Sequence, residues 1–237
     1  MTIRKIALAL SLLALILLGA SSLGVRAGWW AFPVGFKLLS GAVACGGAAL
    51  LLALIGLAVP KWRSGSVPTL VLSAVLGAGA AWFPLHMVQQ AKSLPPIHDI
   101  STDLDNPPAF VAVLPLRVAA ANPAVHGGAE LAAAQRSAYP DIAPLTLAVP
   151  AADAYARALA RAKQMGWTIV AAVPADLSEG RIEATATTFW FGFKDDVVVR
   201  IRSVDGGSRI DVRSVSRVGK SDVGANAARI RAFFAAL

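Results

Sequence analysis

Cysteine and acidic residues are scarce in this chain of 237 residues, and each scarcity excludes something. Cys45 is its only cysteine, so the chain can form neither an internal disulfide nor a metal site built from several cysteines. No acidic residue precedes Asp99, and charged residues make up 15% of the chain, whereas soluble domains contain about 25%. Together with a hydrophobic content of 56%, this composition indicates membrane-spanning segments.

The basic residues are unevenly distributed along the chain, whose formal net charge is +8. Residues 1–91 contain six basic residues and no acidic one, and the rest contains sixteen basic and fourteen acidic residues. The high charge therefore comes mainly from positions that flank apolar runs. Because nucleic-acid binding requires clustered lysine and arginine in a soluble domain, we expect no nucleic-acid partner.

Three uncharged runs, residues 6–25, 38–59 and 67–88, are each about 20 residues long, enough for a helix to cross a bilayer. Aromatic residues typical of membrane interfaces lie beside them or near their ends: Trp29, Trp30, Phe32, Trp62, Trp82 and Phe83. The small residues of "GASSLGVRAG" after the first run also fit a cleaved signal peptide. We favour a retained helix, because the run is long for a signal core and two more runs follow.

The basic residues around these runs predict the orientation of the chain. Four lie before the first run or in the second loop (Arg4, Lys5, Lys61 and Arg63), and three lie on the other side (Arg26, Lys37 and Lys92). The larger group is expected in the cytoplasm. This bias predicts a protein of the bacterial inner (plasma) membrane whose C-terminal domain lies in the periplasm.

Glycine and alanine are dense in the second and third runs, in "SGAVACGGAALLLALIG" and "SAVLGAGAAW". Small residues let helix backbones approach closely. They indicate either that the three helices pack on one another, which we favour, or that they associate with the helices of a partner. No run has an ionisable residue at its centre, which argues against an ion-coupled transporter.

A proline-rich connector, residues 91–109, is predicted between the membrane region (1–90) and a second domain (110–237), because four prolines prevent a helix through most of it. Its Asp99, Asp103 and Asp105 suggest calcium binding, but the glycine and the closing glutamate of a calcium loop are missing. We therefore predict no metal and no cofactor. Residues 110–144 show little periodicity and predict a long loop, either functional or disordered.

The pattern becomes regular after residue 144. "LTLAV" predicts a short strand, residues 150–165 a helix, and "WTIVAAV" and "GRIEATATTFWFGF" two strands. A hairpin follows, with its turn at "DGG", and then a helix over residues 222–236 with Ser221 as its N-cap. The predicted fold is membrane-anchored α+β: three transmembrane helices, then an antiparallel sheet of four or five strands packed with two helices, in a helix-grip-like arrangement.

The hairpin has one apolar and one polar face, because alternate residues of a strand share a face. The polar face collects Asp196, Arg200, Arg202, Arg209, Asp211, Arg213 and Arg217. One interpretation is a solvated face with cross-strand ion pairs, in which a four-residue connection places Asp196 opposite Arg217 and Arg202 opposite Asp211. The other is a site for an anion, bound by arginine and by the N-terminus of the last helix.

Several longer stretches resemble a known family: "PPIHDISTD", "NPPAF", "AYPDI", "GRIEATATTFWFGFKDDVVVRI" and "SRIDVRSVSRVGKSDVGANAARIRAF". Together they are similar to the bacterial domain of unknown function 1499, in its membrane-anchored version. The resemblance implies no activity and no catalytic residues. It implies that eight residues belong to the characteristic motif of the family: Asp195, Asp196, Arg213, Ser214, Arg217, Asp222, Asn226 and Arg229.

No catalytic residue is predicted, since the sequence lacks nucleophile and metal motifs, and the adjacent Asp195 and Asp196 point to opposite faces of their strand. We predict a non-enzymatic binding or accessory module of the cell envelope with a protein or lipid partner. The alternative is an enzyme that acts on an anionic envelope substrate bearing phosphate or carboxylate. The candidate binding residues are Asp196, Arg200, Arg213, Arg217, Asp222, Asn226 and Arg229.

Overall fold

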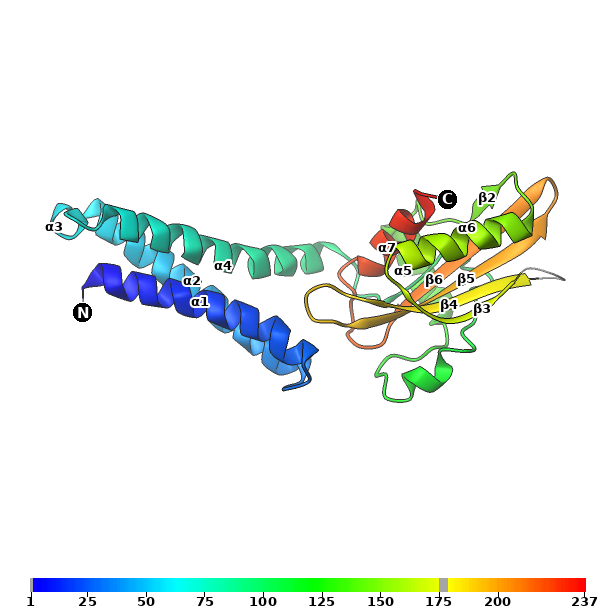
Figure 1. Cartoon of the computed structure of the whole chain (residues 1–237), viewed down its shortest axis with the longest axis horizontal. Coiled ribbons are helices and arrows are strands. Elements are labelled where there is room, and N and C mark those ends of the chain that lie inside the picture. The colour runs from blue at the N-terminus through cyan, green and yellow to red at the C-terminus, as the bar shows by residue number, and fades with distance from the viewer. Residues whose placement is uncertain (1, 175–178) are drawn as a thin grey trace. The chain divides into compact units, whose positions relative to one another are not determined.

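The computed structural model describes residues 2–174 and 179–237 and divides the chain into two compact units (Figure 1). The first unit comprises Met1–Gln90 together with Trp190–Gly192. The second comprises Ala91–Phe189 and Phe193–Leu237. Each unit has its own packing, and each is described separately.

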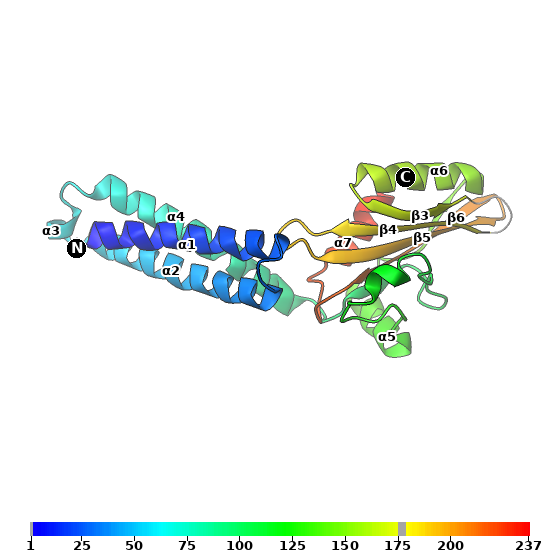
Figure 2. The same cartoon turned by 60° about the horizontal axis from the view of Figure 1, so that its bottom comes forward.

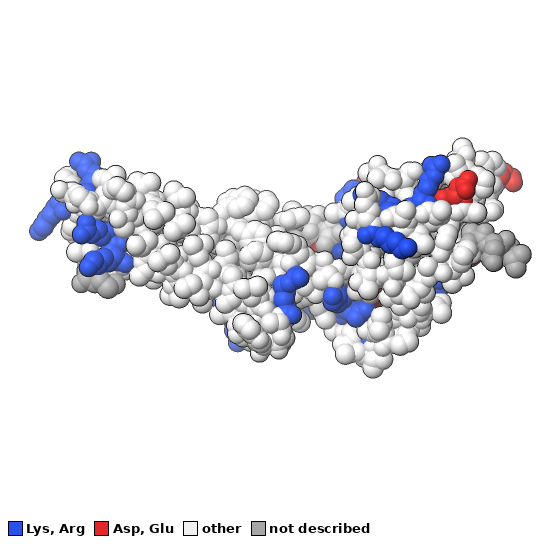
Figure 3. All heavy atoms as spheres, viewed as in Figure 1, with Lys and Arg blue, Asp and Glu red and all other residues white. Residues whose placement is uncertain are grey.

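The first unit consists of helices α1 (Ile3–Arg26), α2 (Phe32–Ala58), α3 (Pro60–Arg63) and most of α4 (Val67–Ser93). By length and composition, α1, α2 and α4 can each cross a membrane, which confirms the three predicted spans and indicates membrane association. Lysine and arginine side chains gather at the end of this unit near α3 (Figure 3). The helices between the two ends of the unit carry an uncharged surface, as a lipid-facing segment requires.

The helices of the first unit approach one another through small side chains. A Cβ atom built on Gly46 of α2 would lie 2.6 Å from the carbonyl oxygen of Gly77 in α4, and one on Gly77 would lie 2.6 Å from that of Gly46. Only glycine permits this backbone contact. The buried positions of α2 are all glycine or alanine, so its small residues serve the packing of the three helices on one another.

The second unit contains a six-stranded antiparallel sheet in the order β1-β6-β5-β4-β3, with β2 also paired to β6. The strands are β1 (Asp99–Ser101), β2 (Leu145–Leu147), β3 (Thr168–Val173), β4 (Glu179–Thr187), β5 (Lys194–Val204) and β6 (Gly207–Ser216). The predicted α+β class is confirmed. The sheet has more strands than expected because β1, three residues long, is too short for a clear alternation, whereas β2 corresponds to the predicted strand "LTLAV".

The turn between β5 and β6 has two residues, Asp205 and Gly206, and Gly206 has a φ of 78° that suits glycine. The predicted grouping of like faces is therefore correct. The register expected from a four-residue connection is wrong: Asp196 lies opposite Val215, and Arg202 lies opposite Arg209. Arg200 lies directly opposite Asp211 and pairs with it, whereas Arg202 reaches Asp211 diagonally.

Helices α6 (Ala151–Gln164) and α7 (Ala225–Phe234) supply the core on one side of the sheet. Helix α6 buries a stripe of alanines, and the rings of Trp167 and Phe233 stack with their centroids 5.1 Å apart. Helix α7 begins later than predicted, and its N-cap is Gly224, where we expected Ser221. Val223 (φ 53°) and Gly224 (φ 81°) are left-handed, which prevents an earlier start.

The opposite side of the sheet is covered by the segment between β1 and β2 (Figure 2). This cover contains a 3-10 turn, η1 (Leu114–Arg117), and the segment then continues into α5 (Gly128–Ala138), which packs against the core that α6 and α7 supply. The prediction of a long loop over residues 110–144 missed α5, because the turn residues of "ANPAVHGG" precede it and only Ala132 and Gln135 are buried. Phe110 and Val113 pack on Val198 and Val215 of the sheet, so the polar face of the hairpin lies beneath this segment.

Candidate functional site

The candidate residues divide between the two faces of the β5–β6 ribbon. Four lie on the side covered by the β1–β2 segment: Asp196, Arg200, Arg213 and Arg217. The other three lie between the sheet and the start of α7: Asp222, Asn226 and Arg229. Asp196, Arg200 and Arg213 are 0%, 5% and 2% exposed. The interpretation of the polar face as a solvated surface is therefore wrong, because the β1–β2 segment buries most of it.

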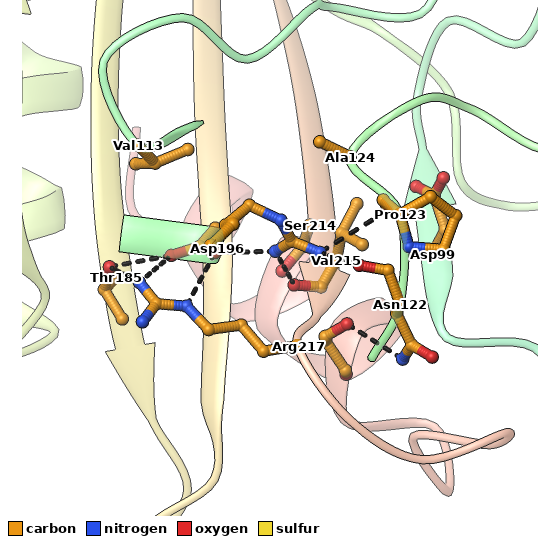
Figure 4. A network of polar contacts seen from close by, with 12 residues as sticks. Asp99, Val113, Asn122, Pro123, Ala124, Thr185, Asp196, Ser214, Val215 and Arg217 are labelled. Atoms are coloured by element: carbon orange, nitrogen blue, oxygen red, sulfur yellow. Dashed lines mark hydrogen bonds and ion pairs between the residues drawn. The ribbon is translucent and has the colours of Figure 1, made fainter. Parts of the chain in front are cut away.

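Asp196 accepts hydrogen bonds from three side chains. Arg217 donates from Nε (2.9 Å) and Nη2 (2.8 Å), Arg117 from Nη1 (2.6 Å), and the hydroxyl of Thr185 at 2.8 Å. In Figure 4, Thr185 and Arg217 both point toward Asp196. Burial alone would raise the pKa of Asp196, but these hydrogen bonds from Arg217, Thr185 and Arg117 outweigh it and lower the pKa. Asp196 therefore stays ionised within a cage of donors.

A second cluster joins Asp103 and Asp211 to three arginines. Arg200 Nη2 lies 2.9 Å from an oxygen of each carboxylate. Arg209 also contacts both, with Nε 2.9 Å from Asp211 and Nη2 2.9 Å from Asp103, and Arg202 donates to Asp211 at 2.8 Å. Since Asp103 follows β1, these bonds fasten the start of the covering segment to β5 and β6.

Arg213 forms a third cluster with Asp99. Its Nε and Nη2 donate to the two carboxylate oxygens at 2.9 and 2.8 Å, the paired geometry that arginine prefers. The same guanidinium donates to the carbonyls of Pro108 (3.2 Å) and Ala124 (2.9 Å). It also lies 5.1 Å from the ring centroid of Phe110, a cation–π distance. Arg213 thus joins β6 to β1 and to two points of the β1–β2 segment, Pro108 and Ala124.

Glu183 of β4 holds the same loop through its backbone. Its fully buried carboxylate accepts hydrogen bonds from the amides of Val111 and Val113, each at 3.0 Å. A buried carboxylate requires such donors, because burial without them is costly. The arginines of this face are therefore bound to acids and carbonyls of the same domain, and their arrangement fastens the loop to the sheet.

On the helix side, Asn226 connects α7 to β6 and to the chain before β1. Its amide nitrogen donates to the carbonyl of His98 and to the hydroxyl of Ser216, both at 3.0 Å. Its oxygen accepts a hydrogen bond from Ser214 at 2.7 Å and another from Arg229. Asn226 is fully buried, so this side chain has a structural role.

Arg229 of α7 joins the same cluster and links it to β5 and β6. Its Nη2 lies 2.5 Å from a carboxylate oxygen of Asp195, and its Nη1 lies 2.9 Å from the hydroxyl of Ser214. Asp222 accepts hydrogen bonds from the amides of Gly224 and Asn226, each at 2.8 Å, and so caps α7. Burial raises the pKa of Asp222, and the nearby charge of Asp195 raises it further, although the two amides oppose the shift.

A groove of about 320 Å³ lies beside Arg229, between the end of α6, the edge of the sheet and α7. Its lining is mostly small or apolar: Met165, Gly166, Trp167, Ala186, Thr187, Ala225, Ala228, Arg229 and Ala232. Ala228 and Ala232 are exposed on α7. The groove is therefore lined by small side chains with one guanidinium at its side, and its exposed surface is partly polar.

A family model described as "Protein of unknown function (DUF1499)" matches residues 99–237, more than half of the chain. The chain belongs to this family. No curated protein and no solved structure matches it. The matched region begins at the first residue of β1, so the DUF1499 domain includes Asp99 and every acid and arginine of the clusters described above.

Sequence reasoning placed the arginines of the DUF1499 domain on one face but missed several of their partners. Asp99 and Asp103 were considered only as calcium ligands, whereas they pair with Arg213 and with Arg200 and Arg209. Glu183 and Arg117 were not identified at all. Within residues 2–174 and 179–237, no group of three or more histidine, cysteine, aspartate or glutamate side chains could hold a metal ion.

Proposed function

We propose that the protein is a membrane-anchored, non-enzymatic binding module of the cell envelope, in which the groove beside Arg229 receives the head group of an anionic lipid. We place the three apolar helices in the bacterial inner membrane and the DUF1499 domain in the periplasm. The excess of basic residues near α3, which belongs on the cytoplasmic side, supports this orientation.

The lining of the groove carries the proposal. Arg229 is held by Asp195 and Ser214, so its guanidinium is oriented before a ligand arrives, which lowers the entropic cost of binding. Guanidinium groups bind phosphate and carboxylate oxygens well. The neighbouring alanines and Trp167 suit the glycerol and upper acyl carbons of a lipid. A volume of about 320 Å³ is large enough for a small head group.

The position of the groove in the sheet also supports a lipid ligand. Ala186 and Thr187 lie at the end of β4, which pairs with the first residues of β5. Asp195 of β5 pairs with Ser216, and the adjoining Val215 pairs with Asp99, where the chain enters the sheet from the membrane helices. The groove therefore lies at the end of the domain that is tethered to the bilayer.

Catalysis on an anionic envelope substrate is the second candidate. An enzyme of this class needs a nucleophile and a base within hydrogen-bond reach of one another. The residues that line the groove supply a guanidinium, a threonine hydroxyl and apolar groups, a set suited to binding. We therefore favour binding, and turnover of the bound lipid would decide for the enzyme.

Native mass spectrometry of the full-length protein, extracted gently from its membranes and then titrated with phosphatidylglycerol, tests the proposal. Ala228→Phe fills the groove from an exposed position, and Ala160→Phe, exposed on α6, is the matched control. We expect a lipid adduct on the wild type and on Ala160→Phe, and its loss in Ala228→Phe. Equal adducts on all three proteins would refute the groove, a protein lost only from Ala228→Phe would refute the lipid, and a converted lipid would establish the enzyme.

A further inference from the structure

The loop between β4 and β5, residues 188–193, has the unusual sequence Thr-Phe-Trp-Phe-Gly-Phe. Hairpin loops are normally built from glycine, asparagine, aspartate and proline, which are polar or set the backbone. Here Gly192, with a φ of 70°, supplies the turn geometry alone, and four of the other five residues are aromatic. Phe189 is 89% exposed. Together with the partly exposed Trp190, Phe191 and Phe193, Phe189 forms an apolar patch of the kind that marks a protein or membrane interaction site.

The topology of the domain places this loop at the tethered end of the sheet. It joins Thr187 to Lys194, which pair with each other, and the neighbouring Asp195 pairs with Ser216. Beside them, β1 begins at Asp99. Only residues 94–98 separate Asp99 from the end of α4, and six residue steps span about 20 Å at most. The loop is thus on the side of the domain where the bilayer is within reach.

The turn at the opposite end of β5 has a polar composition. Strand β5 is 11 residues long, so the β5–β6 turn lies about 33 Å from the β4–β5 loop at the ordinary rise of a strand. That turn is formed by Asp205 and Gly206, and Asp205 is exposed and polar. The two loops project from opposite ends of the sheet (Figure 2). The aromatic residues are therefore confined to the tethered end.

We infer that the β4–β5 loop is an interfacial membrane anchor, which inserts the exposed ring of Phe189 among the head groups and upper acyl chains of the bilayer that the chain's own helices cross. Tryptophan and other aromatic residues favour this zone because their rings are partly polar. The anchor is independent of the groove and gives the domain a second attachment besides the covalent connector.

The test uses the full-length protein in lipid nanodiscs, with Cys45→Ala removing the only cysteine. A single cysteine is then introduced as Phe189→Cys or, as the matched control at the far end of β5, as Asp205→Cys, and each is labelled with the fluorophore NBD. Phosphatidylcholine carrying a doxyl quencher high on the acyl chain is compared with one quenched deep in the chain. Both labelled sites are exposed, so folding is expected to be unaffected.

At position 189 we expect blue-shifted emission that the shallow quencher suppresses more than the deep one, and at position 205 we expect emission unchanged by either. Unquenched emission at 189, or equal quenching at both sites, would overturn the anchor. Thr187→Cys, exposed at the end of β4, keeps all four rings in place. Its quenching should fall when Phe189→Asp is added, and unchanged quenching would mean that Phe189 does not hold the loop in the lipid.

Discussion

Arg213 provides the sharpest test of how the covering loop is held. Replacing it with methionine keeps much of the side-chain length but removes the paired bonds to Asp99 and the bonds to Pro108 and Ala124. The side chains of Arg213 and Asp99 are 3% and 4% exposed, so Asp99 would remain as a buried charge without its partner. Breaking such a pair costs about 3–5 kcal/mol, and we expect Arg213→Met to lower the free energy of unfolding by that amount.

Two further variants separate the buried charge from ordinary packing. Arg231 pairs with Asp141 at 2.6 Å, but both side chains are about half exposed, so Arg231→Met should cost no more than about 1 kcal/mol. Adding Asp99→Val to Arg213→Met removes the stranded charge. The double variant should therefore be more stable than Arg213→Met alone, although the two carbonyls still lack their donor.

Urea unfolding of the full-length protein in mild detergent, followed by circular dichroism, measures these differences. The dependence of the unfolding free energy on urea concentration should be the same in all variants. Unfolding of Arg213→Met and Arg231→Met at the same urea concentration would contradict the role of the buried ion pair. Simple addition of the losses of Arg213→Met and Asp99→Val would contradict it too, because two residues that share a buried ion pair must show coupling.

Three further predictions concern Glu183, Asp196 and Tyr139. Glu183→Gln leaves one oxygen for the amides of Val111 and Val113, so it should cost about 1–3 kcal/mol and speed hydrogen exchange at both amides; unchanged exchange would contradict this role. The lowered pKa of Asp196 contributes stability that is present above its ordinary pKa and lost as pH falls through the folded value. Acid unfolding should therefore be less steep in Asp196→Asn, and an identical acid limb would refute it. The buried hydroxyl of Tyr139 has no hydrogen-bond partner among the residues that the structure describes, so Tyr139→Phe should unfold at the same or higher urea concentration; a clear loss would reveal a partner.

The features of local periodicity were predictable from the sequence. The three apolar spans follow from length and composition, and the β5–β6 ribbon follows from alternation and a glycine-containing turn. The sharing of faces was also correct, because the period of a strand does not depend on the turn as long as the connection has an even number of residues. These features depend only on residues that are close in the sequence, so they can be predicted from a single sequence.

The partners of the arginines were not predictable in the same way. Asp99 and Arg213 are 114 residues apart, and the three-residue strand that brings Asp99 to β6 has no recognisable pattern. The seven charged residues of the polar face gave no sign that another segment covers them, since a solvated face and a paired buried face have the same alternation. Only Asp99 of β1 and Asp103 of the covering segment distinguish the two, and their role depends on long-range contacts.

The position of Asp99 and Asp103 close to the last membrane helix has a consequence for the design of soluble fragments. The chain that follows α4 also supplies the edge strand β1 and two of the carboxylates that pair with arginines of the sheet. A soluble fragment cut at the more obvious boundary, after the prolines near residue 108, would lack both acids. Arg200, Arg209 and Arg213 would then lose partners inside the sheet. The tether and the domain therefore share residues, and a fragment that is to fold must keep the chain from before Ile97.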